Sequence, residues 1–550
     1  MSSPAAKQLP LLLAGAIALR AYAAWTSGLV ADDAVQYVEL AELIEAADWD
    51  GALASWTPPL QPLLLALLHR ATGDWVLGGT ILEIVAGAVI VLAVYALTHE
   101  AFGASAAVWA GTLAAVHPEL AREVGLLLAD ATALALTALS LWLGVLGGRR
   151  RPLLATAASG MAAGLAYLAR PEGVLAAAVL GPWLVAIHAF RPGRRHLALL
   201  APAALLAGFL ATGGPYALYL SLDEGRPVIS RKKFADAFEA LRWGPGYRWS
   251  RKVEERKKTL TAERAARVAE VRGLAEGLIG GRNFEWEGGK SSSFVGFVDP
   301  KRNKPADEPR PGILRALAAA LGELPSACHP AVLALGLIGL LLPSPGDRPW
   351  RRAFVGLFLA GVALNVLVLL LVNREAGYVS HRHAMGAVLF VLPLSALGAG
   401  ALTNEATGRF GDRFGSRRVV VAVALVVLAT ILPKTLKPRS ERRLAERRVA
   451  ERIADGSLGD PGVVVSCLPR IPLYAGRPGV QLPQGGGYGA LVALLVSKDA
   501  ALVVVDERHF WLIAPLVVWA WLQPVHEEGE GERRIRVFRT LAPLRDGPRP

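Results

Sequence analysis

Long apolar blocks that are almost free of charged residues recur along the chain and constrain its fold more than any other feature. Two of them run from Trp75 to Thr98 and from Val124 to Gly148. A block of about 20 apolar residues matches the hydrocarbon thickness of a bilayer. Over the 550 residues, 53% are hydrophobic and 19% are charged. This pattern predicts a polytopic membrane protein and excludes an ordinary cytosolic enzyme, a disordered chain and a disulfide scaffold.

Hydropathy predicts about eleven transmembrane helices. They lie near residues 9–28, 75–98, 105–117, 124–147, 152–169, 173–190, 197–221, 326–343, 353–372, 384–402 and 419–433. Only Lys7 precedes the first block, so this segment lacks the basic cluster of a signal peptide and is expected to be a retained anchor.

Positive charge gathers in four short loops and orients the predicted helices. The clusters are Arg149 to Arg151, Arg191 to Arg195, Arg348 to Arg352, and Arg409 to Arg418. Each cluster follows an even-numbered helix, so all four lie on one side, which the positive-inside rule makes the cytoplasm. The amino terminus is then predicted inside and the carboxyl terminus outside. The formal net charge is +13. Because the arginines lie between apolar blocks, where they orient a membrane protein, we expect no nucleic-acid binding.

Two loops and a terminal domain are predicted outside the bilayer. In the first outer loop, residues 28–74, seven acidic residues and no Lys or Arg lie between Val30 and Thr57. The second, residues 223–325, is polar and mildly basic, and an amphipathic helix is expected from Val253 to Leu278. After a transmembrane domain of residues 1–435, β-branched runs alternate with helix-like segments, which predicts a small α/β domain over 436–550.

We assign no chemistry to this terminal domain. The two cysteines of the chain, Cys328 and Cys467, are too few for a disulfide framework or a metal cluster.

Charged residues at a membrane interface are informative because burying them is costly. Asp32 and Asp33 follow the first apolar block directly, at the start of a helix whose apolar face holds Tyr37, Leu40 and Ile44. Asp33 falls on that apolar side. A carboxylate that faces a cavity could serve as general base toward a hydroxyl group. The alternative is that Asp32 only caps the helix, since Asp is a favoured N-cap residue.

Four segments follow one another along the chain: the Asp-Asp-Ala-x-x-Tyr run at 32–37, Trp56-Thr57-Pro58-Pro59-Leu60, Ala169-Arg170-Pro171-Glu172-Gly173 and Ser380-His381-Arg382-His383. In this order they resemble the protein O-mannosyltransferase and lipid A aminoarabinose transferase superfamily. Members of this superfamily are membrane glycosyltransferases with the GT-C fold. The resemblance implies an all-α polytopic fold with catalytic acids in the first outer loop and, as in bacterial members, a plasma (inner) membrane location with a soluble outer domain.

The resemblance also implies an activity. Asp32 matches the catalytic Asp of the family, and Asp33 matches its second acid, which is usually Glu. Family members activate an acceptor oxygen, which attacks the anomeric carbon of a polyprenyl-phosphate sugar with inversion. The acceptor could be a glycan, a lipid or a protein. The resemblance implies no metal and no cofactor beyond this donor substrate.

Further acids end the third predicted helix on the outer face. Glu119 and Glu123 are four residues apart and would share a helix face. We expect Glu119 to serve as a further catalytic acid and Glu123 to contact substrate. A structural pair between Arg122 and Glu119 is the alternative. Asp130 lies within the next apolar block, where an unpaired carboxylate is expensive, so it is expected to have a partner.

A lipid-linked phosphate requires cationic donors at the outer interface. Arg170 and Arg382, with the neighbouring His383, are placed for this role, because the planar guanidinium group matches phosphate oxygens. Tyr37, within the first motif, is expected to contact substrate. Arginines at helix ends could instead extend to the lipid headgroups. His381 and His383 have no nearby acidic cluster, and we predict no metal there.

A transporter or flippase of a lipid-linked or amphipathic substrate is the competing interpretation. Transporters usually place their polar site near the bilayer midplane, often at broken helices of repeated halves. This sequence has no evident internal repeat, and its acids gather at one interface, which favours the enzyme.

Overall fold

The computed structural model describes residues 4–27, 30–191, 193–231, 311–342, 348–376, 379–438, 441–459, 462–482, 487–507, 509–518, 521–531 and 534–541. These residues form two compact units. The first is helical and comprises most of the chain up to Pro438, and the second contains residues 27–36 and the chain after Arg439. The expected amphipathic helix at 253–278 lies outside the described residues.

The helical unit confirms the prediction of an all-α polytopic fold. Its main helices are α1 (Pro4–Thr26), α5 (Trp75–Phe102), α6 (Ala104–Val116), α8 (Ala129–Arg149), α9 (Leu154–Ala169), α10 (Val174–Ala189), α11 (Leu197–Glu224), α14 (Ile313–Cys328), α15 (Pro330–Leu341), α16 (Arg348–Ala376), α17 (His381–Phe414) and α18 (Ser416–Leu436). Shorter helices are α3 (Trp49–Leu53), α4 (Leu60–Thr72) and α7 (Pro118–Arg122), and α2 (Asp32–Glu45) belongs partly to each unit.

Among the described residues, eight helices are long and apolar enough to cross a membrane, and the bent pair of α14 and α15 makes a ninth candidate. The apolar helices α6 and α9 are shorter. The chain is thus a multi-pass membrane protein, while the count of eleven spans and their orientation stay predictions.

The span predicted near 326–343 covers the end of α14 and the whole of α15. The chain bends by 100° between α14 and α15. His329 stands at the bend with a φ of 64°, and Pro330 begins the next helix. The residue before a proline avoids the α region, so the helix is interrupted there.

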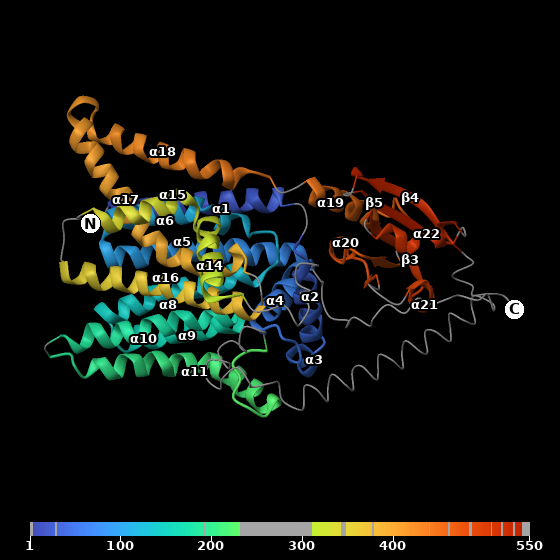
Figure 1. Cartoon of the computed structure of the whole chain (residues 1–550), viewed down its shortest axis with the longest axis horizontal. Helices are drawn as coiled ribbons and strands as arrows, with labels where there is room; N and C mark the ends of the chain where they lie inside the picture. The colour runs from blue at the N-terminus through green and yellow to red at the C-terminus, as the bar shows by residue number, and fades with distance from the viewer. Residues whose placement is uncertain are drawn as a thin grey trace. The chain divides into compact units, whose positions relative to one another are not determined.

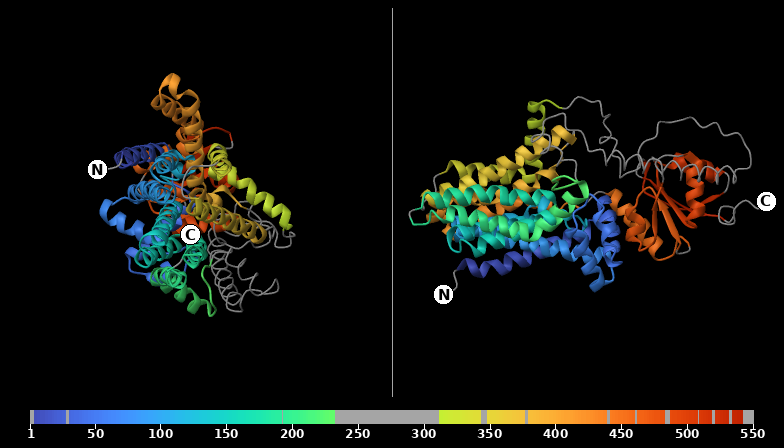
Figure 2. Two further views of the ribbon diagram at one scale, coloured as in Figure 1. Left: turned by 90° about the vertical axis from the view of Figure 1, so that its left-hand side faces the viewer. Right: turned by 90° about the horizontal axis from the view of Figure 1, so that it is seen from below.

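Small residues allow neighbouring helices of the bundle to pack closely. Figure 1 shows α5, α8, α9, α10 and α11 side by side, and Figure 2 views the same bundle from one end. Between α9 and α11, a Cβ atom added to Gly160 would lie 2.0 Å from the carbonyl oxygen of Leu205, and one added to Gly208 would lie 2.0 Å from that of Ala157. Small residues at such crossings let two backbones approach, as is common between membrane helices.

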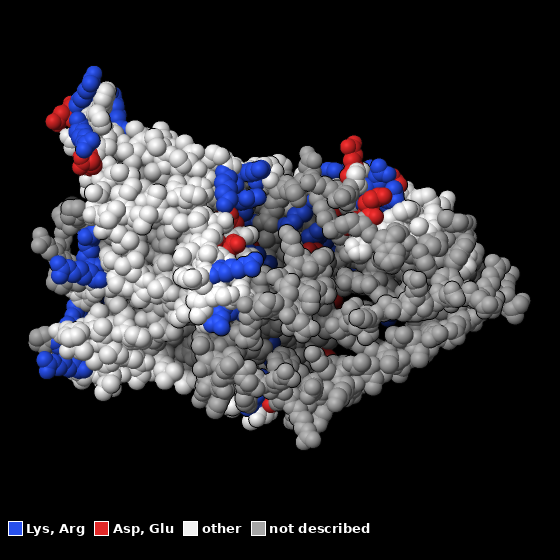
Figure 3. Space-filling model, in the orientation of Figure 1, with Lys and Arg blue, Asp and Glu red and all other residues white. Residues whose placement is uncertain are grey.

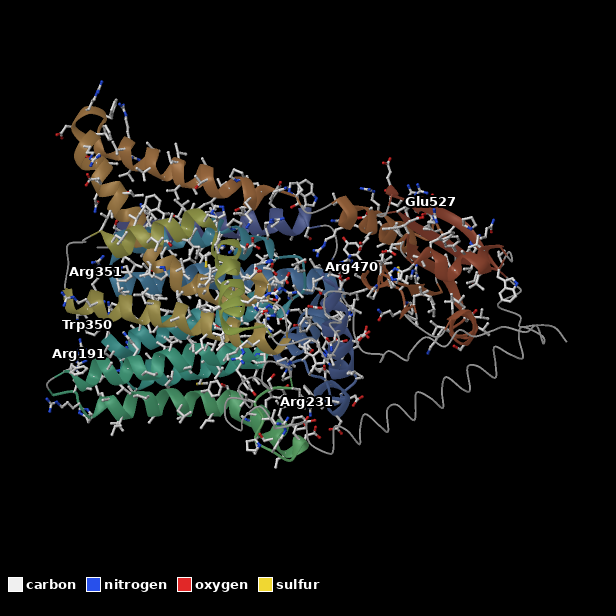
Figure 4. The ribbon with its side chains drawn as sticks, viewed as in Figure 1. Arg191, Arg231, Trp350, Arg351, Arg470 and Glu527 are labelled. Carbon is white, nitrogen blue, oxygen red and sulfur yellow. The ribbon has the colours of Figure 1, made fainter. Side chains whose placement is uncertain are left out.

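On the face of the helical bundle that Figure 3 shows, charged side chains lie at the two ends. Figure 3 shows an uncharged face along the helices with Lys and Arg side chains at either end. At one end, labelled in Figure 4, the guanidinium of Arg191 lies 3.9 Å from the ring centre of Trp350, and that of Arg149 lies 5.6 Å from the same ring. The predicted arginine clusters after α8 and α10 thus meet at the start of α16.

The second unit contains the predicted small α/β domain. Its strands are β1 (Val463–Ser466), β2 (Gly479–Gln481), β3 (Ala500–Asp506), β4 (Leu522–Glu528) and β5 (Ile535–Thr540), and its helices are α19 (Glu441–Ala454), α20 (Arg470–Tyr474), α21 (Gly487–Ser497) and α22 (Phe510–Val518). The sheet order is β2-β1-β3-β5-β4. The first three strands are parallel, and β5 is antiparallel to β3 and β4. Strand β3 is buried along its whole length, as expected for its continuous apolar run.

Candidate functional site

A buried carboxylate joins two arginines in the helical unit. Asp130, in the first turn of α8, is 3% exposed. Its Oδ1 accepts a hydrogen bond from Nη1 of Arg170, and its Oδ2 accepts one from Nη2 of Arg382 at 2.8 Å. The expected partner of Asp130 is confirmed, and both arginines predicted to bind phosphate converge on it.

Local sequence places each arginine at a helix end. Arg170 follows α9, where Pro171 disfavours continuation of the helix. Glu172, in the short 3₁₀ turn Pro171–Gly173, lies 3.4 Å from Nη2 of Arg170. Arg382 is the second residue of α17, and its side chain retains 32% of its surface exposed. The guanidinium of Arg382 is therefore oriented by Asp130 but still accessible.

His383 belongs to the cap of α17. The backbone N–H of Ser380 donates to Nδ1 of His383 at 3.3 Å, and Oγ of Ser380 lies 2.9 Å from the same nitrogen. This reciprocal arrangement satisfies polar groups that a helix start leaves without intrahelical partners. His383 thus has a structural contact in addition to its predicted contact with substrate.

Glu119 contacts a lysine and a histidine from two other helices. Its Oε1 lies 2.8 Å from Nζ of Lys434 near the end of α18, and its Oε2 lies 3.7 Å from Nε2 of His381. The expected alternative was a pair with Arg122 on the same helix, whereas these partners come from α17 and α18. Lys434 was not among the predicted site residues. The sequence feature that could have pointed to Lys434 is its position at the end of the last apolar block.

The segment between α7 and α8 is shaped by a carboxylate from α5. Glu83 is buried and accepts backbone N–H groups of Gly125 at 2.6 Å, Leu126 at 3.2 Å and Leu128 at 2.8 Å. Leu127 adopts a φ of 57° within this turn. The neighbouring Glu123 is also buried. Glu83 thereby fixes the backbone that leads into Asp130. Its place within an apolar block was the available signal, because a carboxylate there requires partners.

The first-loop acids begin α2, and residues 27–36 belong to the second unit. Both Asp32 and Asp33 lie in the first turn, where negative charge is favourable at a helix N-terminus. Within this unit, Oδ1 of Asp32 lies 3.1 Å from Nη1 of Arg470. Burial raises the pKa of the Asp32 carboxyl above its ordinary value, and the guanidinium of Arg470 opposes this rise.

The other predicted residues of α2 differ in exposure. Tyr37 is 9% exposed, together with the buried Leu40 and Ile44 of the predicted apolar face. Asp33, expected on that same side, is exposed. Helical side chains tilt toward the amino terminus, so in the first turn this carboxylate extends past the end of the helix.

The chain is similar to known proteins in both sequence and fold. Residues 57–213 match the sequence profile described as dolichyl-phosphate-mannose-protein mannosyltransferase. No match was found among curated proteins. The fold is similar to that of apo ArnT from Cupriavidus metallidurans, with a TM-score of 0.55, 14% identity and 100% of each chain covered.

Two complexes show the same similarity. One is ArnT from Cupriavidus metallidurans bound to undecaprenyl phosphate, with a TM-score of 0.53, 13% identity and 99% of each chain covered. The other is the oligosaccharyltransferase AglB from Archaeoglobus fulgidus with an inhibitory peptide and a dolichol-phosphate, with a TM-score of 0.50, 13% identity, 94% of this chain covered and 72% of that chain. The chain has the GT-C fold.

This result confirms the predicted fold and the predicted resemblance to GT-C glycosyltransferases. Within the helical unit of this GT-C protein, Asp130 gathers Arg170 and Arg382, while Glu119 gathers His381 and Lys434. Asp32 and Asp33 belong to the other unit. The catalytic and binding roles of all these residues stay predictions.

Proposed function

We propose that this protein is a membrane glycosyltransferase that takes a sugar from a polyprenyl-phosphate carrier and transfers it to an acceptor on the extracytoplasmic face. The proposal is supported by the GT-C fold and by the profile match over residues 57–213. Relatives in fold bind undecaprenyl phosphate and dolichol-phosphate, which supports a polyprenyl phosphate as the carrier of this chain.

The observation that carries the proposal is the pair of arginines on Asp130. An anionic phosphate needs fixed donors, and a carboxylate that accepts from both guanidinium groups limits their motion before the ligand arrives. Arg382 retains an accessible surface for phosphate oxygens. In the proposed complex, Arg382 and Arg170 bind the carrier phosphate, with His383 and Glu123 at the edge of the same site.

Asp32 serves as the general base in the proposed reaction. It takes the proton of the acceptor hydroxyl group, whose oxygen attacks the anomeric carbon. The bond between that carbon and the phosphate oxygen breaks, the electron pair stays on the polyprenyl phosphate, and the configuration at the anomeric carbon inverts. A carboxylate whose pKa is raised by burial is a stronger base than an ordinary Asp. Asp33 and Glu119 are the supporting acids, and Tyr37 contacts the substrate.

The test is transfer by purified protein in lipid vesicles that contain a polyprenyl-phosphate sugar with a radiolabelled sugar. Asp32→Asn should lower kcat by about 10²–10⁴-fold, the usual contribution of a general base. The matched control is Asp50→Asn, which removes an exposed carboxylate of the same loop. Transfer by Asp32→Asn at the rate of the control, in protein with an unchanged unfolding temperature, would exclude Asp32 as the base.

A further inference from the structure

The terminal sheet has a point where the chain leaves two neighbouring parallel strands in opposite directions. Strands β1 and β3 are adjacent and parallel. After β1 the chain passes through α20 to β2 at one edge, and after β3 it passes through α22 to β4 at the other edge (Figure 1). Open α/β sheets bind ligands in the crevice that such diverging connections leave at the carboxyl ends of the strands.

Three side chains that can ligate a metal meet at this point. Cys467 directly follows β1, Asp506 ends β3, and His509 precedes α22. Their Sγ, carboxylate oxygen and ring nitrogen lie within 4.8 Å of one another, and among the described residues this is the only group of three such ligands. Oδ1 of Asp506 lies 2.5 Å from Nδ1 of His509 and 3.9 Å from Sγ of Cys467.

The backbone holds these three groups in place. The N–H of Cys467 donates to the carbonyl of Val504 at 3.1 Å, which continues the pairing of β1 with β3. The N–H of Asp506 donates to Sγ of Cys467 at 3.3 Å, and the N–H of His509 donates to Oδ1 of Asp506 at 3.2 Å. Burial and the Asp506 carboxylate raise the pKa of the Cys467 thiol more than the hydrogen bond to its sulfur lowers it, so the thiol keeps its proton until a metal displaces it. Such outer contacts orient the ligands of metal sites.

Two structural explanations leave part of the cluster unexplained. Asp506 accepts the N–H of His509 just before α22, as a capping residue would, but this role requires neither the thiol nor the imidazole. A nucleophilic Cys–His arrangement needs the imidazole on the thiol with the acid behind it. Here the carboxylate oxygen contacts both the thiol and the ring.

We propose that Cys467, Asp506 and His509 bind one zinc ion, Zn²⁺, with the fourth coordination position open to water or an exogenous ligand. On binding, the thiol of Cys467 releases its proton to solvent, His509 carries its ring proton on Nε2, and sulfur, Nδ1 and a carboxylate oxygen each form a bond to the ion. Thiolate, imidazole and carboxylate are the ligands that zinc takes in proteins.

The site requires little rearrangement and has an entrance. Bonds of about 2.0–2.3 Å in a tetrahedron place ligand atoms about 3.3–3.8 Å apart, so the ring and the carboxylate separate by about 1 Å. Asp506 is 1% exposed, whereas the side chain of His509 is 32% exposed. An ion can therefore reach the buried carboxylate and thiol from the side of the imidazole. This proposal is independent of the proposed glycosyl transfer.

The experiment titrates Co²⁺, a spectroscopic substitute for zinc, into the full-length protein in detergent. We expect one equivalent to produce a near-ultraviolet thiolate-to-cobalt charge-transfer band that Zn²⁺ abolishes by displacement. Cys467→Ser should lose the band, and His509→Ala should weaken Zn²⁺ binding by at least about tenfold. Circular dichroism establishes that each variant is folded.

Two variants serve as matched controls. Cys328→Ser removes the other buried cysteine, and His526→Ala removes a histidine of the same sheet that pairs with Glu528 at 3.2 Å. Both should bind one Co²⁺ with the full band. In the wild-type protein, Zn²⁺ should also protect Cys467 from alkylation, which needs no variant. A wild-type protein without the band, a band that survives Cys467→Ser, or unprotected Cys467 would each overturn the proposal.

Discussion

Oδ2 of Asp130 accepts a hydrogen bond from Nη2 of Arg382 at 2.8 Å, across 252 positions of sequence. The same carboxylate accepts from Arg170, so one buried acid joins the start of α8, the end of α9 and the start of α17. Burying a carboxylate in a low-dielectric environment is costly unless cationic hydrogen-bond donors compensate its charge. Asp130 therefore both stabilises the bundle and positions the guanidinium groups that we propose bind phosphate.

The first prediction concerns the removal of this charge. Asp130→Asn removes the carboxylate that Arg170 and Arg382 share, although Arg170 keeps Glu172. Breaking a buried ion pair costs about 3–5 kcal/mol. We expect a clear fall of the unfolding temperature in detergent. The control is Glu405→Gln, which breaks the exposed pair with Arg409 on α17 and should change stability by less than about 0.5 kcal/mol. Equal unfolding temperatures for both variants would contradict a structural role of Asp130.

The second prediction concerns phosphate binding by Arg382. Arg382→Ala should raise the KM for the polyprenyl-phosphate sugar by about tenfold or more, since a hydrogen bond to a charged group contributes about 1.5–3 kcal/mol. Arg382→Lys should recover part of the loss, because it restores the charge but not the planar fork. Arg409→Ala, an exposed arginine of the same helix, should leave KM unchanged. A loss in kcat alone would assign Arg382 to folding or to catalysis instead of donor binding.

The sequence carried enough information for the fold but only part of the site. Apolar blocks such as Trp75–Phe102 are long enough to identify bilayer helices, because the thickness of the hydrocarbon core sets their length. The need of Asp130 for a partner followed from the cost of a buried charge. The sequence did not reveal that the partners are Arg170 and Arg382, because tertiary packing brings them to Asp130 and no local pattern encodes that packing.

Tertiary packing also explains why the sequence does not reveal the contacts of Lys434 and Glu83. Lys434 near the end of α18 resembles any basic residue at a helix terminus, and only the packed bundle brings it to Glu119. Glu83 gains its function from three backbone N–H groups more than 40 positions away. The bend at His329 had a local signal in Pro330, but hydropathy averaged over the block concealed it.

The third prediction concerns the pH dependence of transfer. A general base must be ionised, and burial raises the pKa of Asp32, so the rate should begin to fall at a higher pH than for an unperturbed Asp. Arg443 lowers this pKa by its positive charge. Arg443→Met should therefore move the acid limb of the pH–rate profile to still higher pH, while Arg443→Lys should leave it in place. A limb that does not respond to the charge at 443 would assign the titration to another group.

The fourth prediction concerns the pair of Glu119 with Lys434. Lys434→Met leaves a buried carboxylate with a weaker partner, and Glu119→Gln removes the charge that the lysine compensates. A double-mutant cycle on unfolding temperatures should give a coupling of about 1 kcal/mol, because Lys434 is partly exposed. The control cycle pairs Glu119→Gln with Lys437→Met, an exposed lysine just beyond α18, and should be additive. Additive effects in both cycles would show that the 2.8 Å contact contributes nothing.

The fifth prediction concerns the crossing of α9 and α11. Gly160→Ala and Gly208→Ala each introduce a methyl group about 2.0 Å from a backbone carbonyl oxygen of the facing helix, and backbone cannot yield as a side chain does. Each should therefore destabilise the bundle by about 1–3 kcal/mol, the usual cost of overpacking. Gly214→Ala, in the same helix α11, meets its nearest atoms only at 3.6 and 3.7 Å and should be tolerated. Because both substituted glycines separate the same two helices, the double variant should lose less than the sum of the single losses. Unfolding temperatures of Gly160→Ala and Gly208→Ala equal to that of Gly214→Ala would mean that the two helices do not approach this closely.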